Sequence, residues 1–104
     1  MKKGWVYFIQ IGSGGPIKIG WTGRTIPIRL RELCSKYPWL EIRFLGKLPG
    51  TKKREGRLHE IFRKDMIVPD IVPEGVMPIL ETELFRPSES LMGYIDRLQA
   101  VALS

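Results

Sequence analysis

Two short β-prone runs lie near the start of the chain: residues 5–9 are continuously apolar or aromatic, and residues 17–20 alternate isoleucine with Lys18 and Gly20. The glycine-rich segment 12–15 lies between them. Two β-prone runs joined by a glycine-rich break predict a β-hairpin. A turn centred on this break places Tyr7 opposite Gly20.

The hairpin register divides the side chains between two faces. Tyr7 and Lys18 fall on one face as diagonal neighbours, about 7 Å apart at the backbone and within side-chain reach. We interpret Gly20 as space left beside them for a ligand. The opposite face is apolar and predicts a core formed by Val6, Phe8, Ile17, Ile19 and Trp21.

A helix and a third strand are predicted after the hairpin. Thr25 is a favourable N-cap, and the helix over residues 26–36 ends before Pro38. Alternating residues then predict a strand over 40–48, which ends at Pro49 and the glycine after it. The apolar stripe of the helix consists of Ile26, Leu30, Leu33 and Tyr37.

Two further helices and a loop complete the pattern. Thr51 begins a second helix of about 52–64. Residues 65–82 hold three prolines among apolar residues and predict a packed, irregular loop with at most short strands. Ser88 begins a final helix of about 88–102, which carries one apolar stripe.

The order of these elements predicts an α+β fold, with a small, mostly antiparallel three-stranded sheet flanked by helices and a C-terminal helix. We expect a single domain over residues 1–104 with a core of about 5–64. No apolar stretch approaches the roughly 20 residues that cross a bilayer, so we expect a cytoplasmic protein without a membrane partner. The single Cys34 provides neither an internal disulfide nor a metal cluster. No feature indicates a protein partner.

Positive charge is concentrated in the first part of the chain. Residues 1–64 carry 15 Lys and Arg against 4 Asp and Glu, a net charge of +11, whereas residues 65–104 carry 2 against 7, a net charge of −5. This imbalance favours contact with phosphates over a merely solvated helix face. The candidate nucleic-acid-binding residues are Lys47, Lys52, Lys53, Arg54, Arg57, Arg63 and Lys64.

One stripe of the second helix mixes apolar and titratable residues. Glu55, Leu58, His59 and Phe62 share a face by their spacing. A carboxylate on an inward-facing stripe must find a cation, a donor or solvent. Taken alone, the stripe fits a salt bridge from Glu55 and a hydrogen-bonded His59, just as Arg29 fits a flanking charge. Considered together with the hairpin, these residues favour a site.

Five short motifs follow one another along the chain. They are Trp5-Val6-Tyr7, Lys18-Ile19-Gly20, Arg29-Leu30 with Leu33, Glu55 with Leu58-His59 and Phe62, and Glu83-Leu84-Phe85. In order and spacing they resemble the GIY-YIG nuclease superfamily, in particular its small phage and bacterial branch with a shortened motif. The resemblance covers roughly residues 5–100.

The resemblance implies a metal-dependent endonuclease that hydrolyses phosphodiester bonds of DNA. Tyr7 would act as general base on the attacking water, with its pKa lowered by the neighbouring Lys18 cation. Arg29 would neutralise charge on the scissile phosphate. Glu55 would hold one Mg²⁺ or Mn²⁺, and His59 would relay a proton, orient a metal-bound water or be structural.

The chain departs from the family pattern at several points. Lys18 stands where the full motif has its second tyrosine, which we interpret as a variant of the site. The chain contains no Asn that could support a site. Glu83 has no assigned role, and a cap or a salt bridge explains it equally.

Two other functions compete with the nuclease hypothesis. A catalytically inactive nucleic-acid-binding protein would use the same fold and basic face. A plain protein-interaction domain accounts less well for the charge imbalance. The sequence does not distinguish DNA from RNA.

Overall fold

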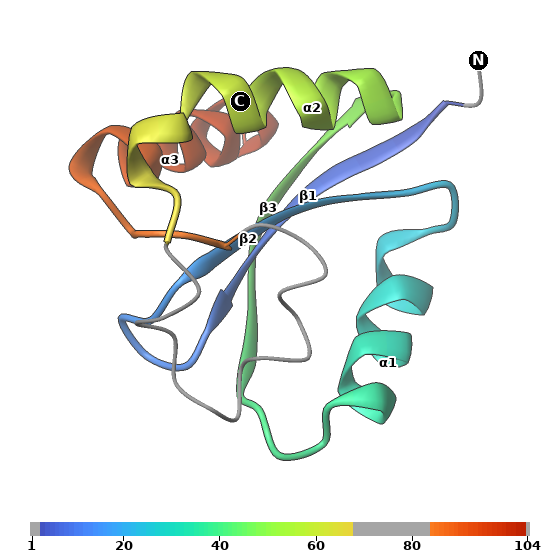
Figure 1. The fold of residues 1–104 in the computed structure, drawn as a ribbon. Helices are drawn as coiled ribbons and strands as arrows, with labels where there is room; N and C mark the ends of the chain where they lie inside the picture. The colour runs from blue at the N-terminus through green and yellow to red at the C-terminus, as the bar shows by residue number, and fades with distance from the viewer. Residues whose placement is uncertain (1–2, 68–83, 104) are drawn as a thin grey trace.

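The computed structural model describes residues 3–67 and 84–103 (Figure 1). The α+β fold and the C-terminal helix predicted from the sequence are confirmed, while the limits of a single domain stay a prediction. In chain order the elements are β1 (Gly4–Ile11), β2 (Ile17–Thr22), α1 (Ile26–Lys36), β3 (Ile42–Gly50), α2 (Lys52–Ile61), the 3₁₀ turn η1 (Arg63–Asp65), β4 (Leu84–Phe85) and α3 (Glu89–Leu103).

The strands form one antiparallel sheet in the order β3-β1-β2-β4. The predicted hairpin register of β1 and β2 is confirmed, with Tyr7 opposite Gly20. The turn between them contains Gly12 and Gly14 at φ angles of 77° and 71°. Glycine adopts this left-handed region at little cost, so the turn chemistry sets the register.

The fourth strand is an addition to the predicted three. Leu84 and Phe85 pair with the first two residues of β2, and both are 0% exposed. A strand of two residues is too short to produce a recognisable alternation, so the sequence pattern did not separate it from the loop. The outer edge of β2 beyond Lys18 therefore has no strand partner among the described residues.

Strand β3 differs from its prediction in two ways. It continues through Pro49 and Gly50 instead of ending before them. A proline is tolerated there because β3 is an edge strand. A β-bulge leaves Leu45 unpaired and shifts the register between Phe8 and Ile9. The inserted residue reverses the alternation of β3, so Leu45 packs against the core under α2 and α3.

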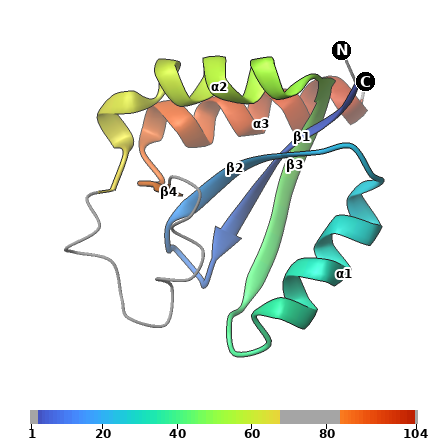
Figure 2. The ribbon, with the colours of Figure 1, turned by 45° about the vertical axis from the view of Figure 1, so that its right-hand side comes forward.

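Both faces of the sheet carry an apolar core, whereas the hairpin pattern predicted one. Helix α1 covers one face, and α2 and α3 lie side by side over the other (Figures 1 and 2). The α1 core contains Tyr7, Ile9, Ile11, Ile26, Leu33, Tyr37 and Leu84. The second core contains Val6, Phe8, Ile17, Ile19, Leu48, Leu58, Phe62, Phe85, Leu91 and Ile95.

The helices lie close to their predicted limits. Helix α1 has the predicted bounds, whereas α2 ends at Ile61 and η1 continues the chain. Thr25 and Thr51 occupy the N-cap positions, but neither side chain makes a capping hydrogen bond. The capping mechanism expected of these two residues is therefore not used.

Ser88 fastens the start of α3. Its Oγ accepts a hydrogen bond from the backbone of Leu91 at 3.1 Å and donates one to Asp65 at 2.7 Å. Helix α3 is thus tied to η1. Most of the predicted irregular loop, residues 68–82, and Glu83 lie outside the described residues.

In the described part of the chain, no helix combines the length and the apolar character that crossing a bilayer requires.

Candidate functional site

The side chain of Tyr7 lies across Gly20 on the neighbouring strand. A Cβ atom at Gly20 would come within 2.5 Å of Tyr7 Oη and 2.9 Å of its Cε2, well inside van der Waals contact. Tyr7 is 1% exposed. The space that we assigned to a ligand from the sequence is therefore filled by the phenol itself. Gly20 is required for the packing of Tyr7.

Arg29 extends from α1 to the Tyr7 hydroxyl. Its Nε donates a hydrogen bond to Tyr7 Oη at 3.1 Å. Glu32, one turn further along α1, lies 3.9 Å from Arg29 and 3.5 Å from Arg24. Glu32 therefore holds the guanidinium from the solvent side. Its part in the site was not predicted, although its i,i+3 spacing from Arg29 is a signal that the sequence contains.

Lys18 is buried on the same sheet face as Tyr7, as the register predicted. It is 3% exposed, and its Nζ lies 5.9 Å from the centre of the Tyr7 ring. Burial, and then the charge of Arg29, lower the pKa of Lys18 to about 8, while the negative charge of Glu55 opposes the change. Lys18 is therefore a group that gains and loses its proton close to neutral pH.

The pKa of Tyr7 is raised, which corrects the predicted lowering. Loss of solvent on burial is the largest cause, and the charges of Glu55 and Glu32 act in the same direction. Arg29 lowers the pKa through its hydrogen bond and its charge. The cation that stabilises the Tyr7 phenolate is thus Arg29 and not Lys18. Tyr7 is a neutral phenol at pH 7 in the free protein.

Glu55 reaches the site from the other layer of the fold. Helix α2 covers the opposite sheet face and lies along β2, whose outer edge is open where β4 ends. Glu55 is partly exposed, and its charge acts on both Tyr7 and Lys18. Tyr7, Lys18 and Arg29 therefore lie together on one face of the sheet, and Glu55 acts on Tyr7 and Lys18 through its charge from the helix on the other face.

His59 fastens α2 to this edge. Its Nε2 lies 2.9 Å from the carbonyl oxygen of Ile19. Because a carbonyl oxygen only accepts, Nε2 carries the proton. The imidazole also packs against Phe85, with 5.1 Å between ring centres. His59 thus bonds the backbone of β2 at a point where β4 no longer pairs with it. Because Glu55 lies one turn away on the same helix, this bond also positions Glu55.

Glu55 is the residue that the family resemblance assigned to a metal ion. Among the residues that the structure describes, no three His, Cys, Asp or Glu side chains are grouped so that they could hold a metal. Mg²⁺ is commonly bound through one or two carboxylates and completed by waters and substrate phosphates. Glu55 fits that arrangement, because it is partly exposed and forms no ion pair within the described residues. It does not fit a preformed cage.

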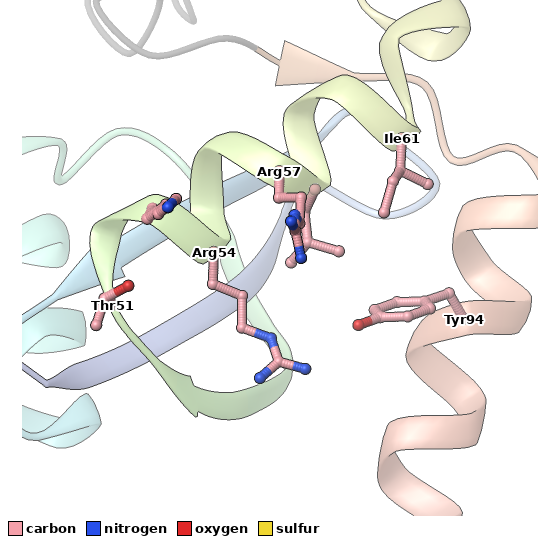
Figure 3. A pocket seen from close by; sticks show the side chains of 7 residues that line it. Thr51, Arg54, Arg57, Ile61 and Tyr94 are labelled. Atoms are coloured by element: carbon pink, nitrogen blue, oxygen red, sulfur yellow. The ribbon is translucent and has the colours of Figure 1, made fainter.

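Three of the predicted nucleic-acid-binding residues share one surface. Lys53, Arg54 and Arg57 line a pocket between α2 and α3 (Figure 3). Lys53 and Arg57 lie on the flank of α2 that faces away from Glu55, because residues two positions apart differ by about 200° around a helix. The strongest cluster of cations is therefore separate from the Tyr7 site.

The other predicted contacts are dispersed. Arg63 lines a smaller pocket beside the end of α2. Lys47 belongs to β3, and its Nζ lies 4.3 Å from the centre of the Trp5 ring. Lys52 and Lys64 are exposed. The basic sequence segment thus becomes several surfaces, because a strand, a helix and a 3₁₀ turn point its side chains in different directions.

Comparison with known proteins identifies the chain by family alone. No curated protein and no solved structure matches it. The profile of the T5orf172 domain matches residues 4–101, nearly the whole chain, whereas the GIY-YIG superfamily itself gives no direct match. T5orf172 domains occur in phage and bacterial proteins and are often associated with nucleases of the GIY-YIG and HNH types. The chain belongs to the T5orf172 domain family.

Proposed function

We propose that the protein is a metal-dependent endonuclease of the GIY-YIG type that hydrolyses phosphodiester bonds of DNA. The observation that carries the proposal is the part-buried hydrogen bond from Arg29 to Tyr7, next to Lys18 and within the field of Glu55. A phenol, two cations and a carboxylate that act on one another match the needs of phosphodiester hydrolysis better than those of packing. The cytoplasmic location expected from the sequence belongs to this proposal.

Tyr7 acts as general base on the attacking water. Because the pKa of Tyr7 is raised, the phenol must first lose its own proton before Tyr7 can accept one from water. Another group must therefore favour the phenolate. Arg29 already donates to the oxygen that would carry the charge. Lys18, with a pKa of about 8, is the nearby group that can take up a proton at neutral to mildly basic pH. We therefore expect cleavage to rise with pH toward that value.

The remaining residues handle charge and position. Arg29 is also placed to neutralise charge on a phosphate that approaches Tyr7. A Mg²⁺ or Mn²⁺ ion held by Glu55 supplies Lewis-acid stabilisation of the leaving oxygen when it is bound. His59 keeps α2 against β2 and so keeps Glu55 facing the site.

The second candidate is a nucleic-acid-binding protein without catalysis. The raised pKa of Tyr7 favours it, as does the lack of a cluster of three metal-binding side chains within the described residues, because there is then neither a preformed base nor a preformed metal cage. The basic residues of α2 serve either function. The two candidates therefore differ in cleavage and not in binding.

Cleavage of supercoiled plasmid DNA in the presence of Mg²⁺ or Mn²⁺ tests the proposal. Wild-type protein should nick the plasmid, and EDTA should stop the reaction. Glu55→Gln should abolish cleavage while nearly retaining affinity for DNA, because it removes only the metal ligand. Glu60→Gln is the matched control, since it removes the same charge from an exposed position on the same helix.

The outcomes separate the two candidates. Wild-type protein that binds DNA but cleaves neither DNA nor RNA with either metal would leave only the binding function. Equal cleavage by the wild type and Glu55→Gln would remove Glu55 from the mechanism. RNA substrates in the same assay decide which nucleic acid is hydrolysed.

A further inference from the structure

A pocket of about 450 Å³ lies between α2 and α3, away from the Tyr7 site (Figure 3). Its volume is in the range of small-ligand pockets. Its lining combines cations, apolar side chains and one aromatic ring: Thr51, Lys53, Arg54, Arg57, Leu58, Ile61 and Tyr94.

The positive charge in this pocket is not neutralised. No carboxylate belongs to its lining. Within the described residues, no ion pair engages Lys53, Arg54 or Arg57. Three unpaired cations on one turn of helix create a field that favours a phosphate group.

The aliphatic stem of Arg54 packs beside the end of β3. Its side chain lies against the backbone of Gly50, where an added Cβ would stand 2.8 Å from Arg54 Cδ and 3.3 Å from its Cβ. The indole of Trp21 donates a hydrogen bond to the Gly50 carbonyl at 3.0 Å, which fixes that backbone. The contact positions the stem and leaves the guanidinium at the pocket, where it is exposed to an incoming anion.

The wall opposite the cations is aromatic and rigid. The Tyr94 ring packs against Phe62 at 5.6 Å and Phe8 at 5.9 Å between ring centres, and its hydroxyl points into the pocket (Figure 3). Leu58 and Ile61 supply apolar surface, and Ile61 is 64% exposed. Cations beside an aromatic and apolar surface suit a phosphate joined to a flat base, which is what an unpaired nucleotide presents.

The exposed surface of α2 between the side that carries Glu55 and the side that lines the pocket has a glycine at position 56. A Cβ added to Gly56 would meet nothing within 4 Å, and its φ is not positive. Neither packing nor backbone conformation in the described structure requires glycine there, although glycine weakens a helix interior. Because position 56 has no side chain, the helix surface is lower there. A nucleic-acid strand can therefore pass over it from the Glu55 side of α2 to the pocket.

We infer that the pocket between α2 and α3 seats one unpaired nucleotide of a nucleic-acid strand that crosses α2 at Gly56. The inference rests on the proposed nucleic-acid partner and does not require cleavage. It assigns strand binding to Lys53, Arg54, Arg57 and Tyr94, in preference to the exposed cations of η1.

Anisotropy titrations with a labelled oligothymidylate test the assignment. Arg54→Ala/Arg57→Ala should weaken binding about tenfold and lower the log–log salt slope by about 1.4, since each phosphate contact on a single strand contributes about 0.7. Arg63→Ala/Lys64→Ala is the matched control with the same change in charge, and it should change the slope by less than half as much. Circular dichroism melting verifies that both variants are folded.

A second readout uses the wild-type protein. Photocross-linking to an oligonucleotide that contains 5-iodouracil, followed by peptide mass spectrometry, should locate the base at Tyr94. Equal losses in the two double variants, or cross-links confined to η1, would overturn the inference while the nucleic-acid partner stands. Wild-type protein that binds no single strand would also overturn it, and absence of binding to duplex as well would remove the proposed partner itself.

Discussion

The phenol of Tyr7 occupies the space where a side chain at Gly20 would stand. The two residues are partners across the β1–β2 hairpin, so the absence of a side chain on one strand sets the position of the proposed base on the other. The same placement brings Tyr7 Oη to 3.1 Å from Arg29 Nε. Packing and chemistry at this point therefore depend on the same glycine.

Gly20→Ala should destabilise the protein and displace Tyr7 from Arg29. The new methyl group overlaps the ring, and overpacking of this kind costs about 1–3 kcal/mol. Urea denaturation measures the loss. Gly56→Ala is the control, because its methyl group meets open space and should raise the free energy of unfolding by about 0.5–1 kcal/mol. A Gly20→Ala protein as stable as the wild type would contradict this packing.

Burial of Lys18 should make stability depend on pH. Its pKa falls from 10.5 to about 8 on folding, so the unfolded chain binds more protons between these values. Below pH 8 both states are protonated, and burying the cation destabilises the fold. The free energy of unfolding should then rise by about 2 kcal/mol as pH increases from 8 to 10.

Urea denaturation at several pH values between 7 and 10 measures this effect of Lys18. Lys18→Met is the comparison, because it has no titrating group and should lose the rise. Readings above pH 10 are left out, since the raised pKa of Tyr7 makes stability fall with pH there. Parallel profiles for the wild type and Lys18→Met would show that Lys18 keeps its ordinary pKa.

Arg29→Gln should raise the pKa values of both Tyr7 and Lys18. It removes the hydrogen bond and the charge that favour the phenolate, and it also removes the cation that repels the Lys18 ammonium. Carbon-13 NMR of labelled Tyr and Lys side chains follows the two titrations. Arg31→Gln removes a charge from an exposed position of the same helix and should leave both unchanged. Equal behaviour of the two variants would mean that Arg29 does not act on the site.

His59→Phe should lower the free energy of unfolding by about 1–3 kcal/mol, because it leaves the Ile19 carbonyl without its donor. His59→Gln can still donate, and we expect it to recover much of the stability. If the protein cleaves DNA, His59→Gln should keep the wild-type pH profile, since a positioning residue does not transfer the proton. A shifted profile in a stable His59→Gln protein would instead indicate proton relay.

The local elements could be predicted because the signals for them are local. The hairpin register follows from the turn glycines, and α1 has the bounds that its apolar spacing indicated. Strand β4 and the bulge at Leu45 were not predicted, because they have no local signal in the sequence. Two paired residues and one inserted residue leave no periodic pattern, and only packing against the sheet defines them.

The candidate site, too, could be predicted from the sequence only in part. The resemblance in motif order and spacing selected Tyr7, Lys18, Arg29 and Glu55 as candidates, and the register placed the first two on one face. The direction of the pKa change at Tyr7 could not be predicted, because it depends on how far burial outweighs the nearby cations. Burial is a property of both sheet faces being covered, which the hairpin pattern did not reveal.

The sequence by itself determined the α+β class, the hairpin register and the helices, because each is encoded within a few positions of its neighbours, and it supplied the candidate residues for the site. Only the tertiary structure decided that Gly20 makes room for Tyr7, that Arg29 is the cation bonded to it, and that the basic residues of α2 lie away from Glu55. Those facts depend on distances between elements far apart in the chain, and such distances are set by how the helices pack on the two faces of the sheet.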